Sequence, residues 1–230
     1  MNTEILNLNT SRGATTAVVA RPDGNTTAAV ILIHEWWGIN DHMRDLADRY
    51  AQEGYTCVSP DLFRGKVAKD SEEAARLMRD LDTVDGLETI SEAIVKTRVA
   101  YGAQKIGITG YCMGGTFALR AACGMSELAA AAPFYGDIPE EKVLAKLNTP
   151  TIFFAGARDN WITPEKVEVL KKAARDYSLP LEVISYDADH AFFNDTRPEV
   201  YDANAATDAW HRVLAHFRKY LGETARPTGA

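Results

Sequence analysis

Hydrophobic residues along the chain gather in short continuous runs that are separated by stretches of helical periodicity. The clearest run is Ala28–Ile33 (AAVILI), which is apolar at every position. Runs of this kind are typical of strands buried on both faces of a parallel sheet. We therefore expect a central parallel sheet, and the further runs predict strands at residues 55–59, 105–109, 129–134, 151–155 and 181–185.

Segments with a helical spacing of apolar residues lie between the expected strands. Residues 41–52 place Leu46 and Tyr50 on one stripe, with Asp41 suited to cap this helix and Gly54 suited to end it. The other segments of this kind predict helices at residues 71–80, 87–100, 114–122, 140–147, 164–177 and 200–221.

Two shorter alternating runs, residues 5–8 and 16–20, come first and have no helix between them. The second ends in the turn sequence Arg-Pro-Asp-Gly-Asn (residues 21–25), so we expect an antiparallel hairpin at a sheet edge. Strand and helix then alternate to the end, which predicts an α/β fold with a mostly parallel sheet and helices on both faces. No segment has the composition of a linker, so residues 1–230 are expected to form a single domain with a tail after Leu221 that frays.

The overall composition narrows the range of partners. Of the 230 residues, 46% are hydrophobic and 25% are charged, as in a globular protein with a sizeable core. The net charge of −7 disfavours nucleic acid and anionic membrane surfaces as partners. The first residues lack the apolar run of a signal peptide, and the three cysteines are too few and too scattered for a disulfide scaffold or a zinc site. We expect a cytoplasmic protein.

The segment at residues 110–115 (GYCMGG) stands where an expected strand passes directly into an expected helix. Its pattern, G-x-C-x-G, matches the nucleophile elbow of α/β-hydrolases with cysteine in place of serine. Glycines on both sides let a strained turn pass close to its neighbours, and the helix N-terminus favours a thiolate. Cys112 is therefore the predicted nucleophile, with a buried structural cysteine in a glycine-rich turn as the alternative. Cys57 and Cys123, inside a strand and at a helix end, are expected to be core residues.

One acid and one histidine follow Cys112 in the order that this fold uses, each after a strand. Asp159 comes after the strand at residues 151–155, and His190 after the strand at residues 181–185. His190 would exchange the proton of Cys112, and Asp159 would orient the imidazole ring. For His34, at the end of the AAVILI strand, we prefer a positioning hydrogen bond. The acids that compete with Asp159 are Asp137, Asp187 and Asp189.

The loop after the AAVILI strand carries a carboxylate, Glu35, next to the expected site. In this fold that loop faces the elbow, so the backbone N–H groups of Trp36 and Met113 are the predicted oxyanion donors. Two neighbouring anions oppose each other, so Glu35 and the thiolate of Cys112 should share one proton. Glu35 would then keep Cys112 neutral at rest. The alternative is a structural ion pair with an arginine such as Arg64 or Arg158.

The chain resembles the dienelactone hydrolase family through motifs spread over most of its length. They are H-E-x-x-G at residues 34–38, S-P-D-L at 59–62, G-Y-C-M-G-G at 110–115, F-Y-G at 134–136, G-x-x-D at 156–159 and D-H-A-F at 189–192. The resemblance implies an α/β-hydrolase fold, a Cys112–His190–Asp159 triad, a regulating Glu35 and no cofactor. It also implies a small-molecule carboxylic ester or lactone as substrate, cleaved through a thioester acyl-enzyme.

Substrate binding departs from the family pattern. Members that cleave dienelactone hold the substrate carboxylate with two arginines, one of which falls where this chain has Asn194. The other falls near Ser71, and no arginine aligns there; Arg76, Arg79 and Arg197 are the candidates to replace them. A largely apolar pocket is expected instead, lined by Trp36, Trp37, Phe63, Trp161, Phe192 and Phe193 beside Asn194. The competing functions are a non-catalytic ligand-binding protein of this fold and a redox role for Cys112.

Overall fold

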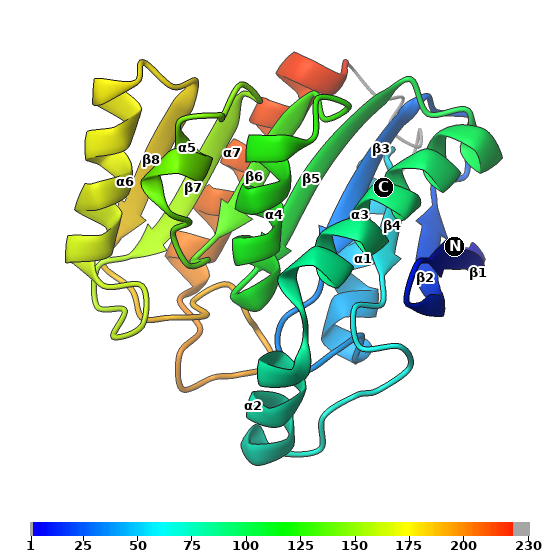
Figure 1. Cartoon of the computed structure of the whole chain (residues 1–230), viewed down its shortest axis with the longest axis horizontal. Helices are drawn as coiled ribbons and strands as arrows, with labels where there is room; N and C mark the ends of the chain where they lie inside the picture. The colour runs from blue at the N-terminus through cyan, green and yellow to red at the C-terminus, as the bar shows by residue number, and fades with distance from the viewer. Residues whose placement is uncertain (1, 223–230) are drawn as a thin grey trace.

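A computed structural model of the protein describes residues 2–222. These residues contain an eight-stranded sheet with the order β1-β2-β4-β3-β5-β6-β7-β8 (Figure 1). The strands are β1 (Asn2–Thr10), β2 (Gly13–Arg21), β3 (Ala28–Ile33), β4 (Thr56–Pro60), β5 (Lys105–Tyr111), β6 (Ala130–Phe134), β7 (Thr151–Gly156) and β8 (Leu181–Tyr186). The strands from β4 to β8 pair in parallel, and β1 and β2 form the expected antiparallel hairpin at one edge.

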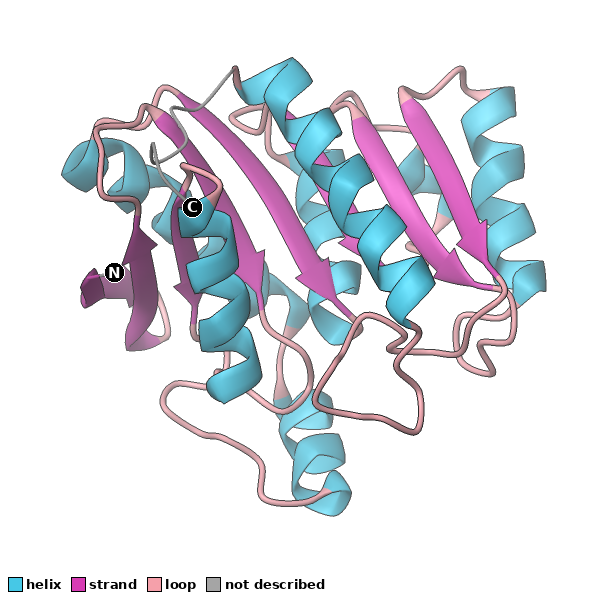
Figure 2. Ribbon diagram, turned by 180° about the vertical axis from the view of Figure 1, so that it is seen from behind, coloured by secondary structure: helices cyan, strands magenta, loops and turns pink. Residues whose placement is uncertain are grey.

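Helices cover both faces of the sheet, which confirms the predicted α/β class (Figure 2). One face packs against α1 and α7, and the other against α3, α4, α5 and α6. Helix α2 projects beyond the carboxyl ends of the strands (Figure 1). The helices are α1 (Asp41–Gln52), α2 (Ser71–Asp80), α3 (Thr83–Tyr101), α4 (Met113–Gly124), α5 (Glu141–Leu144), α6 (Pro164–Asp176) and α7 (Ala203–Leu221).

The residues that cap two helices differ from the prediction. Asn40, and not Asp41, caps α1, since its Oδ1 accepts the backbone N–H of Met43 at 3.1 Å, although the helix spans residues 41–52 as predicted. Asp82 caps α3 in the same way and moves its start from residue 87 to Thr83. The caps therefore shift helix ends by a few residues and leave the order of elements unchanged.

The loops after β3, β5, β7 and β8 meet at the carboxyl edge of the parallel sheet. The chain leaves β3 through α1 toward β4 on one side, whereas β5 lies on the other side of β3. Ligands of such sheets bind where the strand order reverses in this way. Glu35 follows β3 and Cys112 follows β5, so these two residues flank that point.

Two predictions concern the ends and surroundings of the chain. The expectation that the tail frays falls on residues outside the described range. Within residues 2–222, no helix combines the length and the apolar character that crossing a membrane requires.

Candidate active site

Cys112 occupies the sharp turn between β5 and α4. Its backbone has φ 55° and ψ −118°, a conformation that residues other than glycine rarely adopt. Such strain persists only where the surroundings impose it, and it gathers at functional sites. The side chain is 8% exposed, so the turn presents the thiol at the floor of a cavity and shields it from bulk solvent.

The glycines of the GYCMGG motif are required by close backbone contacts. A Cβ atom on Gly114 would lie 2.2 Å from the carbonyl oxygen of Ile33, and one on Gly110 would lie 2.3 Å from that of Gly114. A Cβ on Gly115 would lie 2.2 Å from the carbonyl oxygen of Phe134. The first turn of α4 therefore sits directly against β3 and β6, which fixes where Cys112 points.

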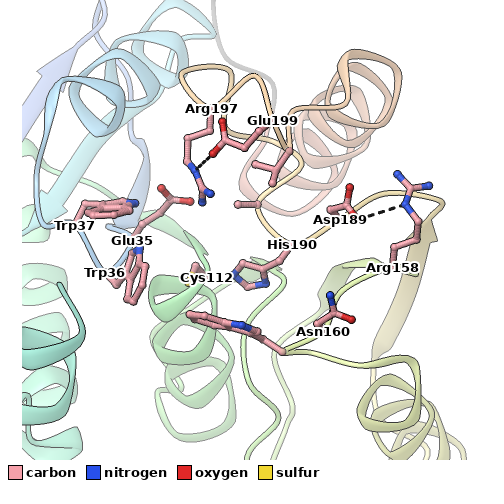
Figure 3. Close-up of a pocket in the computed structure, with 13 residues that line it drawn as sticks. Glu35, Trp36, Trp37, Cys112, Arg158, Asn160, Asp189, His190, Arg197 and Glu199 are labelled. Carbon is pink, nitrogen blue, oxygen red and sulfur yellow. Dashed lines mark hydrogen bonds and ion pairs between the residues drawn. The ribbon is translucent and has the colours of Figure 1, made fainter. Parts of the chain in front are cut away.

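His190 and Asp159 form a hydrogen-bonded pair beside Cys112. The Nδ1 atom of His190 donates to Oδ2 of Asp159 at 2.6 Å, and Figure 3 shows the imidazole ring turned toward Cys112. The other carboxylate oxygen of Asp159 accepts the backbone N–H groups of Trp161, at 2.7 Å, and Ile162, at 2.9 Å. Asp159 is thus held by two backbone donors while it orients the ring.

The competing acids have other partners. Asp137 pairs with Lys166 at 2.7 Å, and both Asp187 and Asp189 pair with Arg158. His34 is fully buried and makes the expected positioning contacts: its Nδ1 donates to the Glu35 carbonyl oxygen at 2.6 Å, and its Nε2 accepts the N–H of Leu62 at 3.1 Å. These contacts join the H-E-x-x-G and S-P-D-L segments.

Glu35 lies buried at the same site and accepts a hydrogen bond from a neutral amide. Nδ2 of Asn194 donates to Oε2 of Glu35 at 2.8 Å. Arg64 pairs instead with Asp85, and Arg158 with Asp187 and Asp189, so neither arginine forms the alternative ion pair with Glu35. Asn194 therefore holds the carboxyl group of Glu35 by a hydrogen bond. It does not line either of the two cavities at Cys112 described below, in which the sequence had placed it.

Burial and hydrogen bonding shift the pKa values of the buried groups in different directions. Burial raises the pKa of Glu35 and so favours its neutral form. Burial also opposes ionisation of Asp159, but the hydrogen bond and charge of His190 outweigh it and lower the pKa of Asp159. For His190, burial disfavours the cation, yet Asp159 and the adjacent Cys112 raise its pKa to about 10. The pKa of Asp159 is therefore lowered, whereas the pKa values of His190 and Glu35 are raised.

Two backbone N–H groups stand at the positions predicted for an oxyanion hole. Met113 is the first residue of α4, where helix geometry leaves N–H groups without a partner in the helix. Trp36 follows Glu35 in the loop after β3. Within residues 2–222 neither N–H donates to a protein acceptor, so both can serve a developing negative charge.

A cavity of about 400 Å³ opens on one side of Cys112 (Figure 3). Its wall is rich in polar and charged groups, so we call it the polar cavity; they are Glu35, Arg158, Asn160, Asp189, His190, Arg197 and Glu199, with Trp36, Trp37, Trp161, Ala191 and Val200. Arg197 points into it and pairs with Glu199 at 2.8 Å. Sequence reasoning named Arg197 only as a candidate and missed Glu199, because the loop before α7 carries no motif.

A second cavity of about 300 Å³ reaches Cys112 from the side of α2 and α4. We call it the apolar cavity, because Met78, Leu81, Met113, Phe117 and Ile162 form much of its wall. Its remaining lining residues are Thr83, Cys112, Thr116, Tyr135, Asp137, Trp161, Lys166 and His190. Cys112, His190 and Trp161 line both cavities.

The predicted aromatic lining is correct in part. Trp36, Trp37 and Trp161 line the polar cavity, whereas Phe63 and Phe192 line neither cavity at Cys112. Phe192 is fully buried among Phe134, Tyr135 and Tyr186, and Phe63 packs against His34, so both are core residues. Phe193 is likewise buried, with its ring against Tyr111 and Phe134. Apolar character alone did not separate core from cavity.

Two further predictions concern arginines and cysteines. Arg76 pairs with Glu73 and Asp80 on the exposed side of α2, and neither it nor Arg79 lines either cavity, which leaves Arg197 as the candidate at the site. Cys57 and Cys123 are buried as expected, and burial raises the pKa of the Cys123 thiol to about 12. No cluster of three or more His, Cys, Asp or Glu side chains in the described part of the chain is arranged to hold a metal ion.

Comparison with known proteins places this arrangement in a family. The family model of the dienelactone hydrolases matches residues 15–221, which include every residue of the site and the whole sheet except β1 and the start of β2. The chain belongs to the dienelactone hydrolase family. It is thus a hydrolase of that family, and small molecules are the expected substrates.

Individual relatives agree with the family assignment. The chain is 34% identical over 203 residues to Protein usf of Aquifex pyrophilus, covering 84% of this chain and 88% of that protein. It is 31% identical over 205 residues to an Aquifex aeolicus protein provisionally named a carboxymethylenebutenolidase, with the same coverage. A crystal structure from Klebsiella pneumoniae, provisionally described as a dienelactone hydrolase, superimposes with a TM-score of 0.87 at 29% identity and covers 95% of this chain and 99% of that one.

Proposed function

We propose that this dienelactone hydrolase family member cleaves a carboxylic ester or lactone with Cys112 as nucleophile, His190 as proton carrier and Asp159 as the orienting acid. The observation that carries the proposal is the 2.6 Å hydrogen bond that turns His190 toward the strained elbow of Cys112. A binding protein has no need of a strained cysteine beside an oriented imidazole. Against the redox alternative, Cys112 forms no disulfide, and the other two cysteines are free and buried, Cys57 inside β4 and Cys123 near the end of α4.

The first half of the reaction forms a thioester. Sγ of Cys112 attacks the carbonyl carbon, and the N–H groups of Met113 and Trp36 stabilise the tetrahedral oxyanion. The intermediate collapses, the carbon–oxygen bond to the alcohol breaks, and His190 donates its proton to the leaving alkoxide. Thiolate leaves more readily than an amine, so amides are poor substrates and activated esters or enol lactones are good ones.

The second half restores the enzyme. His190 takes a proton from water, which attacks the thioester carbonyl through a second oxyanion at the same two N–H groups. The carbon–sulfur bond breaks, the acid product leaves, and the proton returns to the Cys112–His190 pair. No step requires a cofactor.

Glu35 determines how the site tolerates a thiolate. A carboxylate beside Cys112 would oppose the thiolate, so the two groups share one proton. Burial favours Glu35 as the carrier of that proton and outweighs the hydrogen bond from Asn194, which favours the carboxylate. We propose that neutral Glu35 permits the thiolate–imidazolium pair and that ionised Glu35 suppresses it. This proposal reverses the expectation from the sequence that Glu35 keeps Cys112 neutral at rest.

The decisive experiment follows acyl transfer to Cys112. Wild type and the variants Cys112→Ala, Cys112→Ser and Cys123→Ala are assayed with p-nitrophenyl acetate and a panel of lactones, and the acylated residue is located by mass spectrometry. Cys112→Ala should lose at least 10³-fold in kcat/KM, because the nucleophile is removed. Cys123→Ala, a buried cysteine outside the site, should keep wild-type turnover. Wild-type activity in Cys112→Ala, or acylation elsewhere, would refute the assignment.

A further inference from the structure

Cys112 lies where two cavities of different chemistry meet, and Trp161 forms part of both walls. The indole ring of Trp161 stands perpendicular to that of Trp36, with centroids 5.4 Å apart, and lies 5.4 Å from the His190 ring. Its backbone N–H is held by Asp159 at 2.7 Å. The same carboxylate therefore orients the imidazole and anchors the residue shared by the two cavities.

The apolar cavity offers few free polar groups to a ligand. Lys166 and Asp137 are paired with each other at 2.7 Å, and the Thr116 hydroxyl accepts the N–H of Asp137 at 2.8 Å. Two further polar groups line this cavity, the buried hydroxyl of Tyr135 and Nε2 of His190, and the two rings lie 5.0 Å apart. Both groups lie close to Cys112, and Thr83 is the remaining polar residue of the wall.

The polar cavity combines charged side chains with the tryptophans Trp36, Trp37 and Trp161. Glu35, Arg197 and Glu199 face it from one side, and Arg158 and Asp189 from the other (Figure 3). Charges of both signs meet there, so the cavity can solvate and hydrogen-bond a polar group without a fixed preference for one sign. The carbonyl carbon of an ester bears two substituents, and a carbon bonded to Cys112 can direct one into each cavity.

We infer that the substrate is an open-chain ester with two unlike arms, an apolar arm in the cavity formed with Met78, Leu81 and Phe117 and a polar arm in the cavity of Arg197. The inference rests on the proposed function and adds the substrate class to it. A cavity of about 150 Å³ is enough for benzene, so about 300 Å³ accommodates a phenyl ring or a medium-length alkyl chain. A compact lactone would leave one of the two cavities unused.

The first test measures chain-length preference in two ester series, one that lengthens the acyl chain and one that lengthens the alcohol. In one of the two series, kcat/KM of the wild type should rise about 3- to 4-fold for each CH₂ added to the arm, because each methylene is buried. Ending the same arm in a hydroxyl group should lower kcat/KM at least 5-fold, whereas a hydroxyl on the other arm should be tolerated. Flat profiles in both series would overturn the inference, and the series that responds assigns the apolar arm to acyl group or alcohol.

The second test changes each cavity separately. Leu81→Phe and Met78→Phe narrow the apolar cavity from half-buried positions on or beside α2, and Val200→Phe narrows the polar cavity. The two α2-side variants should lower the ratio of kcat/KM for the long-chain ester to that for the short-chain ester to near one, and Val200→Phe should keep the wild-type ratio. An unchanged ratio in both α2-side variants would contradict the apolar subsite.

A third measurement does not depend on hydrolysis. Alkylation of Cys112 by N-methyl and N-hexyl iodoacetamide reports whether the apolar cavity receives an alkyl chain. The hexyl-to-methyl rate ratio should exceed that of a free thiol in the wild type and in Val200→Phe, and fall toward the free-thiol ratio in Leu81→Phe and Met78→Phe. A free-thiol ratio in the wild type refutes the subsite even if esters are cleaved. A high ratio without ester cleavage refutes the proposed function and leaves the subsite standing.

Discussion

At the scale of single residues, the chemistry of the site depends on which of its buried groups are protonated. Asp159 is charged, because its hydrogen bond with His190 and its two backbone donors outweigh the cost of burial. Burial instead raises the pKa of Glu35, and the amide of Asn194 and the positive charges of His190 and Arg197 offset only part of that effect. The pKa of one buried acid is therefore lowered and that of the other raised, at the same site as Cys112.

Glu35→Gln tests the shared proton through the reactivity of Cys112. As pH rises, wild-type Glu35 ionises and opposes the thiolate, whereas glutamine stays neutral and still accepts the amide of Asn194. The ratio of iodoacetamide alkylation rates, variant over wild type, should be close to one at low pH and should increase with pH. A ratio that is constant across the pH range would exclude electrostatic coupling between Glu35 and Cys112.

Asp159→Asn tests the orientation of His190. The amide cannot hold the imidazolium as the carboxylate does, so kcat for p-nitrophenyl acetate should fall by roughly 10²- to 10⁴-fold. The pKa of His190, followed by NMR of the imidazole protons, should fall, because Asp159 contributes to raising it. Asp187→Asn, which alters an exposed partner of Arg158 outside both cavities, is the matched control and should keep most of the activity. If the pKa of His190 in Asp159→Asn were as high as in the wild type, another group would orient the ring.

At the scale of elements, the elbow depends on how closely α4 approaches β3. Continuous apolar runs made the strands predictable to within a residue or two, because a strand buried on both faces leaves little choice of side chain. Helix starts were less predictable, since Asn40 and Asp41 are both good caps and only the backbone geometry selects Asn40. The triad order was visible in the sequence, whereas Arg197 and Phe192 depended on how the loop after His190 folds.

Gly114→Ala tests the contact between α4 and β3. The new Cβ would lie 2.2 Å from the carbonyl oxygen of Ile33, so α4 must move away from the sheet. We expect a loss of about 2 kcal/mol or more in the free energy of unfolding, measured with urea, together with a loss of esterase activity. Gly124→Ala at the other end of α4 meets no atom within 4 Å and should be neutral or stabilising. Equal effects of the two substitutions would show that the close contact between α4 and β3 does not contribute to the free energy of unfolding.

Asn40→Ala tests the corrected cap of α1. Loss of its hydrogen bond to the N–H of Met43 should lower the free energy of unfolding by about 1 kcal/mol. Asp41→Ala removes only a charge from the first turn and should lower it by a few tenths of a kcal/mol. A larger loss in Asp41→Ala would restore Asp41 as the cap.

At the scale of the whole molecule, the raised pKa of Glu35 makes the free energy of unfolding depend on pH. The folded state holds a proton on Glu35 at pH values where the unfolded chain has released it, because burial raises the pKa of Glu35. This contribution is fully present below the pKa of the unfolded chain and is lost as pH rises toward the higher pKa of the folded state.

Glu35→Gln should therefore gain stability relative to the wild type as the pH is raised above about 4.5, the ordinary value for a glutamate. The difference in the free energy of unfolding should change by no more than about 1.4 kcal/mol per pH unit and level off above the folded-state pKa of Glu35. Urea unfolding of both proteins across the pH range measures it. A difference that does not vary with pH would mean that Glu35 keeps its ordinary pKa when folded.

The position of α2 has a consequence for how this enzyme could diversify. Met78 lies on α2 and Leu81 directly follows it, at the apolar cavity. The proposed nucleophile, base, acid and oxyanion donors come instead from the loops after β3, β5, β7 and β8 and from the first residue of α4. Selectivity can therefore change through one peripheral helix without altering the geometry of the reacting atoms. Exchange of residues 71–81 between relatives should therefore change the ester preference without changing the reaction. The loop from Asp159 to Trp161 must stay fixed, because a hydrogen bond joins the acid that orients His190 to the residue that lines both cavities.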